Sequence, residues 1–171
     1  MPSSVMESKP LVMHWIKKIN PTSVLDVGVG VGTYSILMRQ ENIFIPKIDG
    51  IEVWEPYIEK YDLNSKYNNI FNVDAREWKN WKYDLVIFGD VLEHMSKKEA
   101  LAIWKKVSKN AKYAIISIPI IHCPQGDAEN NPFEEHIKDD WTTKEVLESF
   151  SNIIDYHNFS VVGVYLAKFD N

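Results

Sequence analysis

Two apolar periodicities alternate along the chain. Short apolar runs predict buried strands at residues 24–27, 47–53, 69–73, 83–90, 111–118, 153–157 and 160–167. Between them, apolar residues that recur every three to four positions predict helices over residues 10–19, 33–40, 55–63, 96–110 and 142–150. Strands that alternate with helices are typical of an α/β domain with a mainly parallel sheet.

Short sequence motifs help to locate the ends of several of these elements. Ser96 with Glu99, and Thr142 with Glu145, have the spacing of helix capping boxes. The last two predicted strands are nearly contiguous, so we expect an antiparallel hairpin at the end of the sheet. Residues 1–9 have no such pattern, and we expect them to be disordered. The helix at 10–19 is amphipathic and could cover a cleft or simply pack against the sheet.

A glycine turn follows the strand at 24–27. Gly28, Gly30 and Gly32 occupy alternate positions, and Asp26 lies two residues before the first of them. Glycine reaches backbone angles that a Cβ forbids and lets the main chain approach a ligand closely. The helix that begins beyond the turn offers unpaired N–H groups. A dinucleotide site usually has a G-x-G-x-x-G spacing, which this G-x-G-x-G turn does not match.

An acidic residue ends the next predicted strand. Glu52 lies about twenty residues after Gly32, and a carboxylate at that point can accept hydrogen bonds from both hydroxyls of a ribose. This position therefore supports a ligand of the adenosine type.

Two motifs resemble those of a known family. The D-x-G-x-G-x-G sequence of residues 26–32 resembles the first motif of class I S-adenosylmethionine (SAM) dependent methyltransferases. The run Y-D-L-V-I-F-G-D-V-L-E-H, residues 83–94, resembles the fourth motif of the small-molecule, "VLEH"-type members. The resemblance covers roughly residues 20–168. It implies an α/β, Rossmann-like, doubly wound seven-stranded sheet, mostly parallel, with an antiparallel C-terminal hairpin strand. Residues 21–171 would form one methyltransferase domain after an N-terminal segment, residues 1–20, with the amphipathic helix.

The same resemblance implies S-adenosyl-L-methionine as the cofactor and gives roles to individual residues. Val53 would pack on the adenine, Asp74 would accept from its amino group, and the N–H of Ala75 would reach the ring. The end of the fourth strand would border the methionine amino group and the methyl sulfonium. The implied cofactor-binding residues are Asp26, Gly28, Gly30, Gly32, Glu52, Val53, Asp74, Ala75, Gly89 and Asp90.

The acceptor side falls in the irregular segment 119–141, which is rich in Pro, Gly, Asn and Asp. Loops of this length are usually functional, so we expect a lid that closes Phe133 and Trp141 over the acceptor site. His136 is our candidate general base for a hydroxyl acceptor, with His122 as the second candidate, because histidine titrates near neutral pH. A solvated loop histidine is the alternative. We expect the Glu93–His94 pair to support the cleft wall.

Composition limits the remaining choices. The chain has 171 residues, enough for one α/β domain, and a formal net charge of −5, which argues against nucleic acid as the main partner. A single cysteine, Cys123, excludes an internal disulfide framework. No signal peptide and no run of membrane-spanning length is present, so we expect a cytoplasmic protein with no membrane partner. One cysteine and no His/Cys ligand spacing predict no metal site.

These observations predict a SAM-dependent methyltransferase that acts on a small-molecule or exposed acceptor, with oxygen favoured over nitrogen or carbon. Residues 89–92 lack the (Asn/Asp)-Pro-Pro-aromatic run of amino-methylating DNA enzymes, and Cys123 lies outside the Pro-Cys context of cytosine enzymes. Two alternatives stay open: a catalytically silent SAM-binding subunit, and an NAD(P)-dependent oxidoreductase, which the glycine spacing disfavours. The oligomeric state is not predicted.

Overall fold

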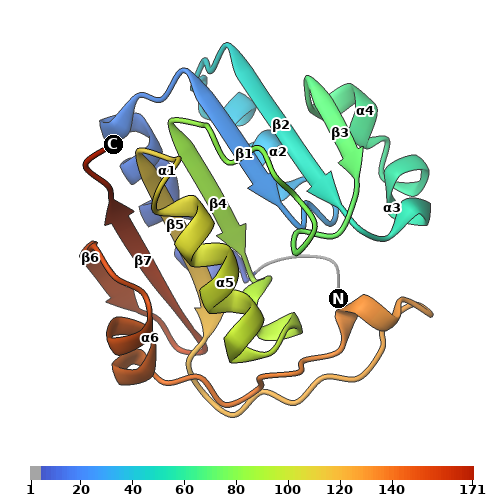
Figure 1. Ribbon diagram of the computed structural model, residues 1–171. Coiled ribbons are helices and arrows are strands. Elements are labelled where there is room, and N and C mark those ends of the chain that lie inside the picture. The colour runs from blue at the N-terminus through green and yellow to red at the C-terminus, as the bar shows by residue number, and fades with distance from the viewer. Residues whose placement is uncertain (1–4) are drawn as a thin grey trace.

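In a computed structural model, which describes residues 5–171, the chain forms a sheet with helices on both faces (Figure 1). The seven strands are β1 (Ser23–Val27), β2 (Lys47–Glu52), β3 (Asn69–Asn72), β4 (Leu85–Gly89), β5 (Tyr113–Pro119), β6 (Ile153–Asn158) and β7 (Val162–Lys168). The α-helices are α1 (Lys9–Ile19), α2 (Thr33–Gln40), α3 (Glu55–Lys60), α4 (Leu63–Lys66), α5 (Lys97–Val107) and α6 (Thr143–Ser149). Three short 3₁₀ helices are η1 (Met6–Ser8), η2 (Leu92–His94) and η3 (Pro132–Glu134).

The strand order is β3-β2-β1-β4-β5-β7-β6. The pairings from β3 through β5 are parallel, whereas β7 runs antiparallel to both β5 and β6. The predicted fold class, a doubly wound and mostly parallel sheet with an antiparallel C-terminal hairpin, is confirmed. Because the order reverses beside β1, the carboxyl ends of β1 and β4 open a crevice of the kind that binds ligands in such sheets.

The strands are apolar throughout because both faces of the sheet are covered. In β4, Val86 and Phe88 point into a core that α5 and α6 cover, while Leu85 and Ile87 point into a second core that α1 and α2 cover. Figure 1 shows α5 in front of the sheet with α1 and α2 behind it. The amphipathic helix α1 therefore packs against the sheet, one of the two arrangements left open by the sequence.

The predicted capping boxes differ in outcome. Ser96 Oγ accepts from the N–H of Glu99, and the Glu99 carboxylate accepts from the Ser96 N–H at 2.9 Å, so the first box is confirmed. Thr142 Oγ1 accepts from the Glu145 N–H at 3.2 Å, but the reciprocal bond is replaced. The Glu145 carboxylate pairs instead with Lys97 at 2.9 Å, so the second box is only half formed.

Two predictions of local structure are wrong. The helix predicted at 55–63 breaks after Lys60, because Asp62 adopts a left-handed conformation with φ of 48°, and a separate short helix follows. The predicted disorder of residues 1–9 fails for η1 and for Lys9. The Lys9 side chain is buried and donates from Nζ to the Tyr34 hydroxyl at 2.9 Å, which anchors the start of α1. Residues 1–4 lie outside the described part of the chain.

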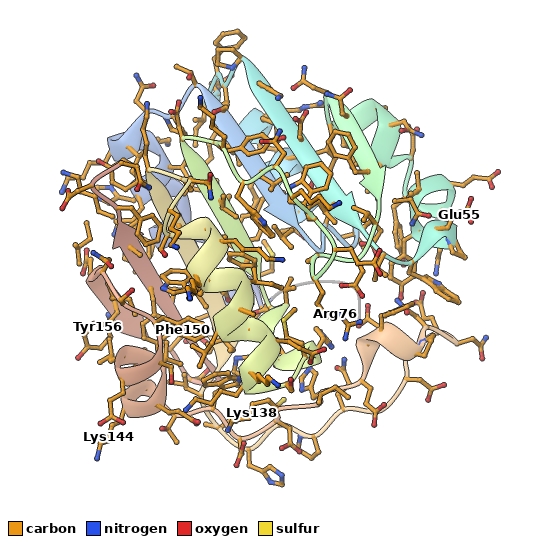
Figure 2. The ribbon with its side chains drawn as sticks, in the orientation of Figure 1. Glu55, Arg76, Lys138, Lys144, Phe150 and Tyr156 are labelled. Atoms are coloured by element: carbon orange, nitrogen blue, oxygen red, sulfur yellow. The ribbon has the colours of Figure 1, made fainter. Side chains whose placement is uncertain are left out.

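The hairpin strand β6 forms one edge of the sheet. Tyr156 on this strand is exposed, and Figure 2 shows it with Lys144 of α6 at the periphery of the molecule.

Among residues 5–171 no helix combines the length and the apolar character needed to cross a membrane.

Candidate functional site

A cavity of about 320 Å³ lies at the carboxyl ends of β1, β2 and β4, a size at the lower end of small-molecule sites. Its walls come from the glycine turn, the ends of β2 and β4, the segment after β3, and the loop between β5 and α6. Eight of the ten predicted cofactor residues line it: Gly28, Gly30, Glu52, Val53, Asp74, Ala75, Gly89 and Asp90. Segments that are far apart in the sequence therefore converge on one cavity, at the strand ends where the sequence predicts the cofactor site.

The glycine turn has the backbone geometry that its composition predicts. Gly28 has a φ of +65°, and a Cβ there would lie 2.6 Å from Val91 Cγ2, so no other residue fits without displacement. The Gly28 N–H donates to the Ile51 carbonyl at 2.9 Å, which ties the turn to β2. Gly32 has a φ of +82° but is not among the cavity-lining residues; it begins α2 and packs against Lys66. The third glycine thus serves the helix start rather than the cavity wall.

Asp26 is also absent from the cavity wall. Its side chain is 1% exposed, and Oδ2 accepts from the Tyr67 hydroxyl at 2.6 Å. Burial raises the pKa of this carboxyl to about 7, against the opposing effect of the Tyr67 hydrogen bond. Asp26 is therefore a buried residue next to the glycine turn rather than part of the cavity wall. Its hydrogen-bond partner, Tyr67, was not marked by any sequence motif.

Glu52, the last residue of β2, lines the cavity. Its Oε2 accepts from the Gly30 N–H at 3.1 Å and its Oε1 from the Trp54 N–H at 2.9 Å. A carboxylate has about four acceptor positions, so each oxygen keeps one for a ligand hydroxyl. Burial raises the pKa of Glu52 to about 7, although the two backbone hydrogen bonds oppose the shift. The carboxylate therefore holds the glycine turn and faces the cavity at once.

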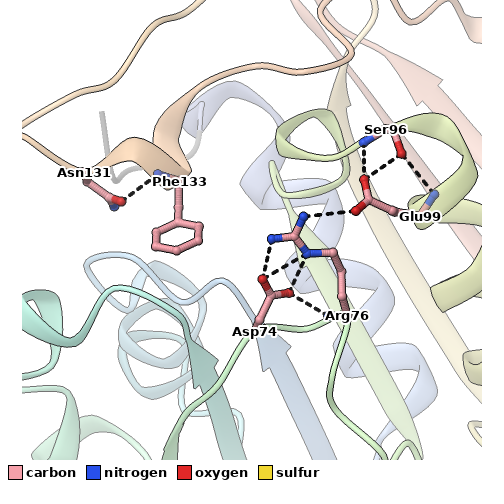
Figure 3. Close-up of polar contacts among 6 residues, drawn as sticks. All are labelled: Asp74, Arg76, Ser96, Glu99, Asn131 and Phe133. Atoms are coloured by element: carbon pink, nitrogen blue, oxygen red, sulfur yellow. Dashed lines mark hydrogen bonds and ion pairs between the residues drawn. The ribbon is translucent and has the colours of Figure 1, made fainter.

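Asp74 has a cationic partner, Arg76, that no sequence motif marked. Its carboxylate accepts from Arg76 Nε at 2.9 Å, and Arg76 also bonds Glu99 at 3.1 Å (Figure 3). Burial opposes ionisation of Asp74, but the Arg76 hydrogen bonds outweigh it and lower the pKa. Val53 and Ala75 add apolar surface to the same cavity. An arginine two residues after an acidic strand end was the available signal.

The end of β4 presents a carboxylate with a spare acceptor. Gly89 closes the strand against Tyr34, whose ring leaves no room for a Cβ. Asp90 Oδ1 accepts from Ser117 Oγ at 2.7 Å, whereas Oδ2 is buried with no hydrogen-bond partner among residues 5–171. Buried polar atoms are nearly always paired, so this oxygen fits a donor group of a bound ligand.

Part of the cavity wall carries two histidines and a buried glutamate. The rings of His94 and His136 meet edge to face with centroids 4.8 Å apart, and Glu93 lies beside them at 1% exposure. His94, expected to support the wall, lines the cavity itself. Desolvation is the main cause that lowers the His94 pKa and that raises the Glu93 pKa well above its usual range. This part of the wall therefore places two histidines and a buried carboxyl group side by side at the cavity.

The loop between β5 and α6 divides into parts with different roles. Phe133 and His136 line the cavity, and Figure 3 shows Phe133 extending from η3 above the strand ends near Asp74. His122, the second candidate base, lies outside the cavity: its side chain is 70% exposed and pairs with Asp139 at 3.3 Å. Trp141 was expected to close over the site, but it is 1% exposed and packs in the core.

The N-terminal segment contributes to the same site. Val5 lines the cavity, and Lys9 lies buried behind it, where desolvation lowers its pKa and Asp90, Asp26 and Glu93 raise it. Lys9 is the nearby cation that offsets these carboxylates. A lysine at the start of an amphipathic helix carries no sequence signal for this role.

No protein-family model matches the chain, and no curated protein matches it. Solved structures do. A candidate O-methyltransferase of Nostoc punctiforme PCC 73102 superposes with a TM-score of 0.71 at 21% identity over 95% of this chain; the chain spans 56% of that protein. The 1,6-didemethyltoxoflavin-N1-methyltransferase of Burkholderia thailandensis, solved with its substrate and S-adenosylhomocysteine, gives 0.68 at 16% identity, covering 96% of this chain and 78% of that one. The methyltransferase domain of a bacterial Hen1 gives 0.65 at 20% identity, covering 94% and 96%. The chain has the class I methyltransferase fold.

Proposed function

We propose that this protein is a SAM-dependent methyltransferase that acts on a small-molecule or exposed acceptor, with a hydroxyl as the favoured acceptor group. The observation that carries the proposal is the convergence of Gly28, Glu52 and Asp90 on one cavity at the switch point of the sheet. The neighbour from B. thailandensis was solved with S-adenosylhomocysteine, the product that SAM leaves after methyl transfer. Supply of an activated methyl group is the chemistry that SAM would bring here.

The cavity residues fit the parts of SAM. Glu52 retains acceptor capacity for the ribose hydroxyls, and Val53 with Ala75 offers an apolar wall for adenine. The unpartnered Oδ2 of Asp90 suits the ammonium group of the methionine portion, because a charged donor would satisfy a buried carboxylate oxygen. In this assignment Asp26 and Gly32 hold the turn without touching the cofactor.

The acceptor would enter from the side of the histidine wall. His136 Nδ1 lies 2.5 Å from the Cys123 carbonyl, which can only accept, so Nδ1 carries the proton and Nε2 keeps its lone pair. We assign Nε2 of His136 to removal of the acceptor proton, a step usually worth 10²- to 10⁴-fold in rate. The chain would otherwise act by alignment of the two reactants, and by exclusion of water under the loop that carries Phe133.

The silent-subunit alternative would need no polar groups opposite the cofactor. The unpartnered buried oxygen of Glu93, beside His94 and His136, is costly unless a ligand contacts it, which favours an active enzyme. We therefore keep the silent subunit as an outcome of the test rather than as a second proposal.

The test is label transfer from methyl-labelled SAM to fractions of a cell extract. The proposal predicts that one small-molecule or macromolecular fraction becomes labelled by the wild type. A His136→Ala variant, which keeps the cofactor residues, should label the same fraction far more slowly. If the wild type binds SAM and labels no fraction, the catalytic part of the proposal is wrong.

A further inference from the structure

Glu93, His94 and His136 offer three ligand atoms within 4.8 Å of one another. Glu93 and His94 belong to η2, which directly follows β4, whereas His136 lies in the loop between β5 and α6. No local spacing in the sequence indicated a metal site, since the second histidine is distant in the chain. The fold brings these side chains together at the cavity wall.

Both histidines are oriented by backbone carbonyls. His94 Nδ1 lies 3.1 Å from the Glu135 carbonyl oxygen, and His136 Nδ1 lies 2.5 Å from that of Cys123. Because a carbonyl oxygen can only accept, each Nδ1 carries the proton and each Nε2 carries a lone pair. A histidine that donates one N–H to a carbonyl and presents the other nitrogen is the usual arrangement of a metal ligand.

Glu93 supplies an independent observation. Its side chain is 1% exposed, and Oε2 has no hydrogen-bond partner in the described chain, residues 5–171. A buried carboxylate oxygen without a partner is expensive, and a cation is the ligand that would best compensate it. Glu93 belongs to the same three-residue group as the two histidines.

We propose that Glu93, His94 and His136 bind one divalent transition-metal ion, of which zinc and cobalt are the test cases. Two imidazoles and one carboxylate suit these ions, whereas magnesium and calcium prefer oxygen ligands throughout. Three protein ligands leave at least one coordination position for water or for an acceptor oxygen, and the group faces the cavity.

To bind one ion, the three ligand atoms must move closer together. With bonds of about 2.1 Å, two ligands on a tetrahedral ion lie about 3.4 Å apart, whereas these atoms spread over as much as 4.8 Å. His136 is on a loop, so its movement toward η2 provides the closure. The ion would then fasten the loop to the end of β4 and hold it over the cavity.

The ion would use the same Nε2 of His136 that the proposed function assigns to the acceptor proton. That part of the inference rests on the proposed function: with the ion bound, Nε2 would no longer accept the proton itself. The ion would instead lower the pKa of a bound acceptor hydroxyl, whose proton would pass to solvent water. Binding of the ion itself depends only on the three side chains.

The test is titration of the purified protein with cobalt(II), followed by visible absorption, together with equilibrium dialysis against zinc. The wild type should bind one ion per chain with the d–d bands of a low-coordinate site. His136→Gln and His94→Gln should each weaken binding at least 10-fold, the lower limit for changes around a site. His122→Gln, in the same loop but ion-paired outside the cavity, is the matched control and should match the wild type.

Absence of stoichiometric binding in the wild type, or equal binding by His136→Gln, would overturn the metal site. His136→Gln is the decisive variant because the ring lies on a loop and outside both hydrophobic cores. S-adenosylhomocysteine titrations on the same samples separate the two proposals. Metal binding without cofactor binding refutes the proposed function alone, and the reverse result refutes the metal site alone.

Discussion

The ring of His94 meets the ring of His136 edge to face at 4.8 Å, although one follows β4 and the other belongs to the loop after β5. The contact joins the end of the motif at residues 83–94 to the irregular segment at 119–141. Both histidines line the cavity that Glu52 and Asp90 also line. This part of the cavity wall therefore depends on a pairing between distant segments of the chain.

Removal of the His136 ring should lower the rate of methyl transfer without changing the affinity for the cofactor. We expect His136→Ala to lose about 10²- to 10⁴-fold in methyl transfer to a hydroxyl acceptor while S-adenosylhomocysteine affinity stays unchanged. His122→Ala should keep turnover near the wild-type value, because that side chain is exposed and paired with Asp139. Initial rates with labelled SAM measure both, and wild-type turnover in His136→Ala would return this histidine to a structural role.

Glu52 should carry a large share of cofactor affinity. Hydrogen bonds to a charged group are worth about 1.5–3 kcal/mol, so Glu52→Ala should weaken SAM binding about 10- to 150-fold. Glu55→Ala, an exposed change three residues along and away from the cavity, should bind like the wild type. Titration calorimetry compares the two variants, and equal affinities would remove the ribose role from Glu52.

The glycine turn should reject even a methyl group. Gly28→Ala places a Cβ 2.6 Å from Val91 Cγ2 at a φ of +65°, so we expect a loss of about 1–3 kcal/mol in unfolding free energy and weaker cofactor binding. Gly126→Ala is the matched control, because a Cβ there meets no atom within 4 Å. Urea denaturation measures both variants. If Gly28→Ala is as stable as Gly126→Ala, the Val91 side chain moves aside without cost and the expected clash is absent.

The buried Asp26 should make stability depend on pH. Its pKa rises from near 3.9 in the unfolded chain to about 7 in the folded one, so between these values the folded chain binds more protons. The free energy of unfolding should therefore fall as pH rises from 4 to 7 and then level off. Glu52 shifts in the same direction, so only the difference between wild type and variant isolates Asp26.

Asp26→Asn keeps an acceptor for the Tyr67 hydroxyl but cannot ionise. Relative to this variant, the wild type should lose roughly 1–3 kcal/mol between pH 5 and pH 8, at 1.36 kcal/mol per pKa unit. Urea denaturation at the two pH values gives the comparison. Parallel pH profiles would show that Asp26 keeps an ordinary pKa.

Much of the fold follows from local pattern. The apolar runs, the Ser96–Glu99 box and the near-contiguous last strands predicted the sheet and its antiparallel end, because these signals are short-range. The break at Asp62 escaped prediction, since a left-handed aspartate in a helical pattern leaves no compositional mark. The burial of Lys9 likewise depends on Tyr34, a partner that only the fold supplies.

The site shows the same division. Residues at strand ends, such as Glu52 and Asp90, were predictable because carboxyl ends of parallel strands meet at one edge. The loop was not predictable in detail: Trp141 joined the core and His122 stayed in solvent, because nothing local decides which loop side chains turn inward. The pairing of His94 with His136 required the whole chain.

Calorimetric titration of the wild type with S-adenosylhomocysteine, SAM and NAD tests the central claim most directly. We expect saturable binding of both sulfur compounds at one site per chain, with far weaker binding of NAD. Absence of heat with either sulfur compound, or tighter binding of NAD, would contradict the assignment of this cavity to SAM.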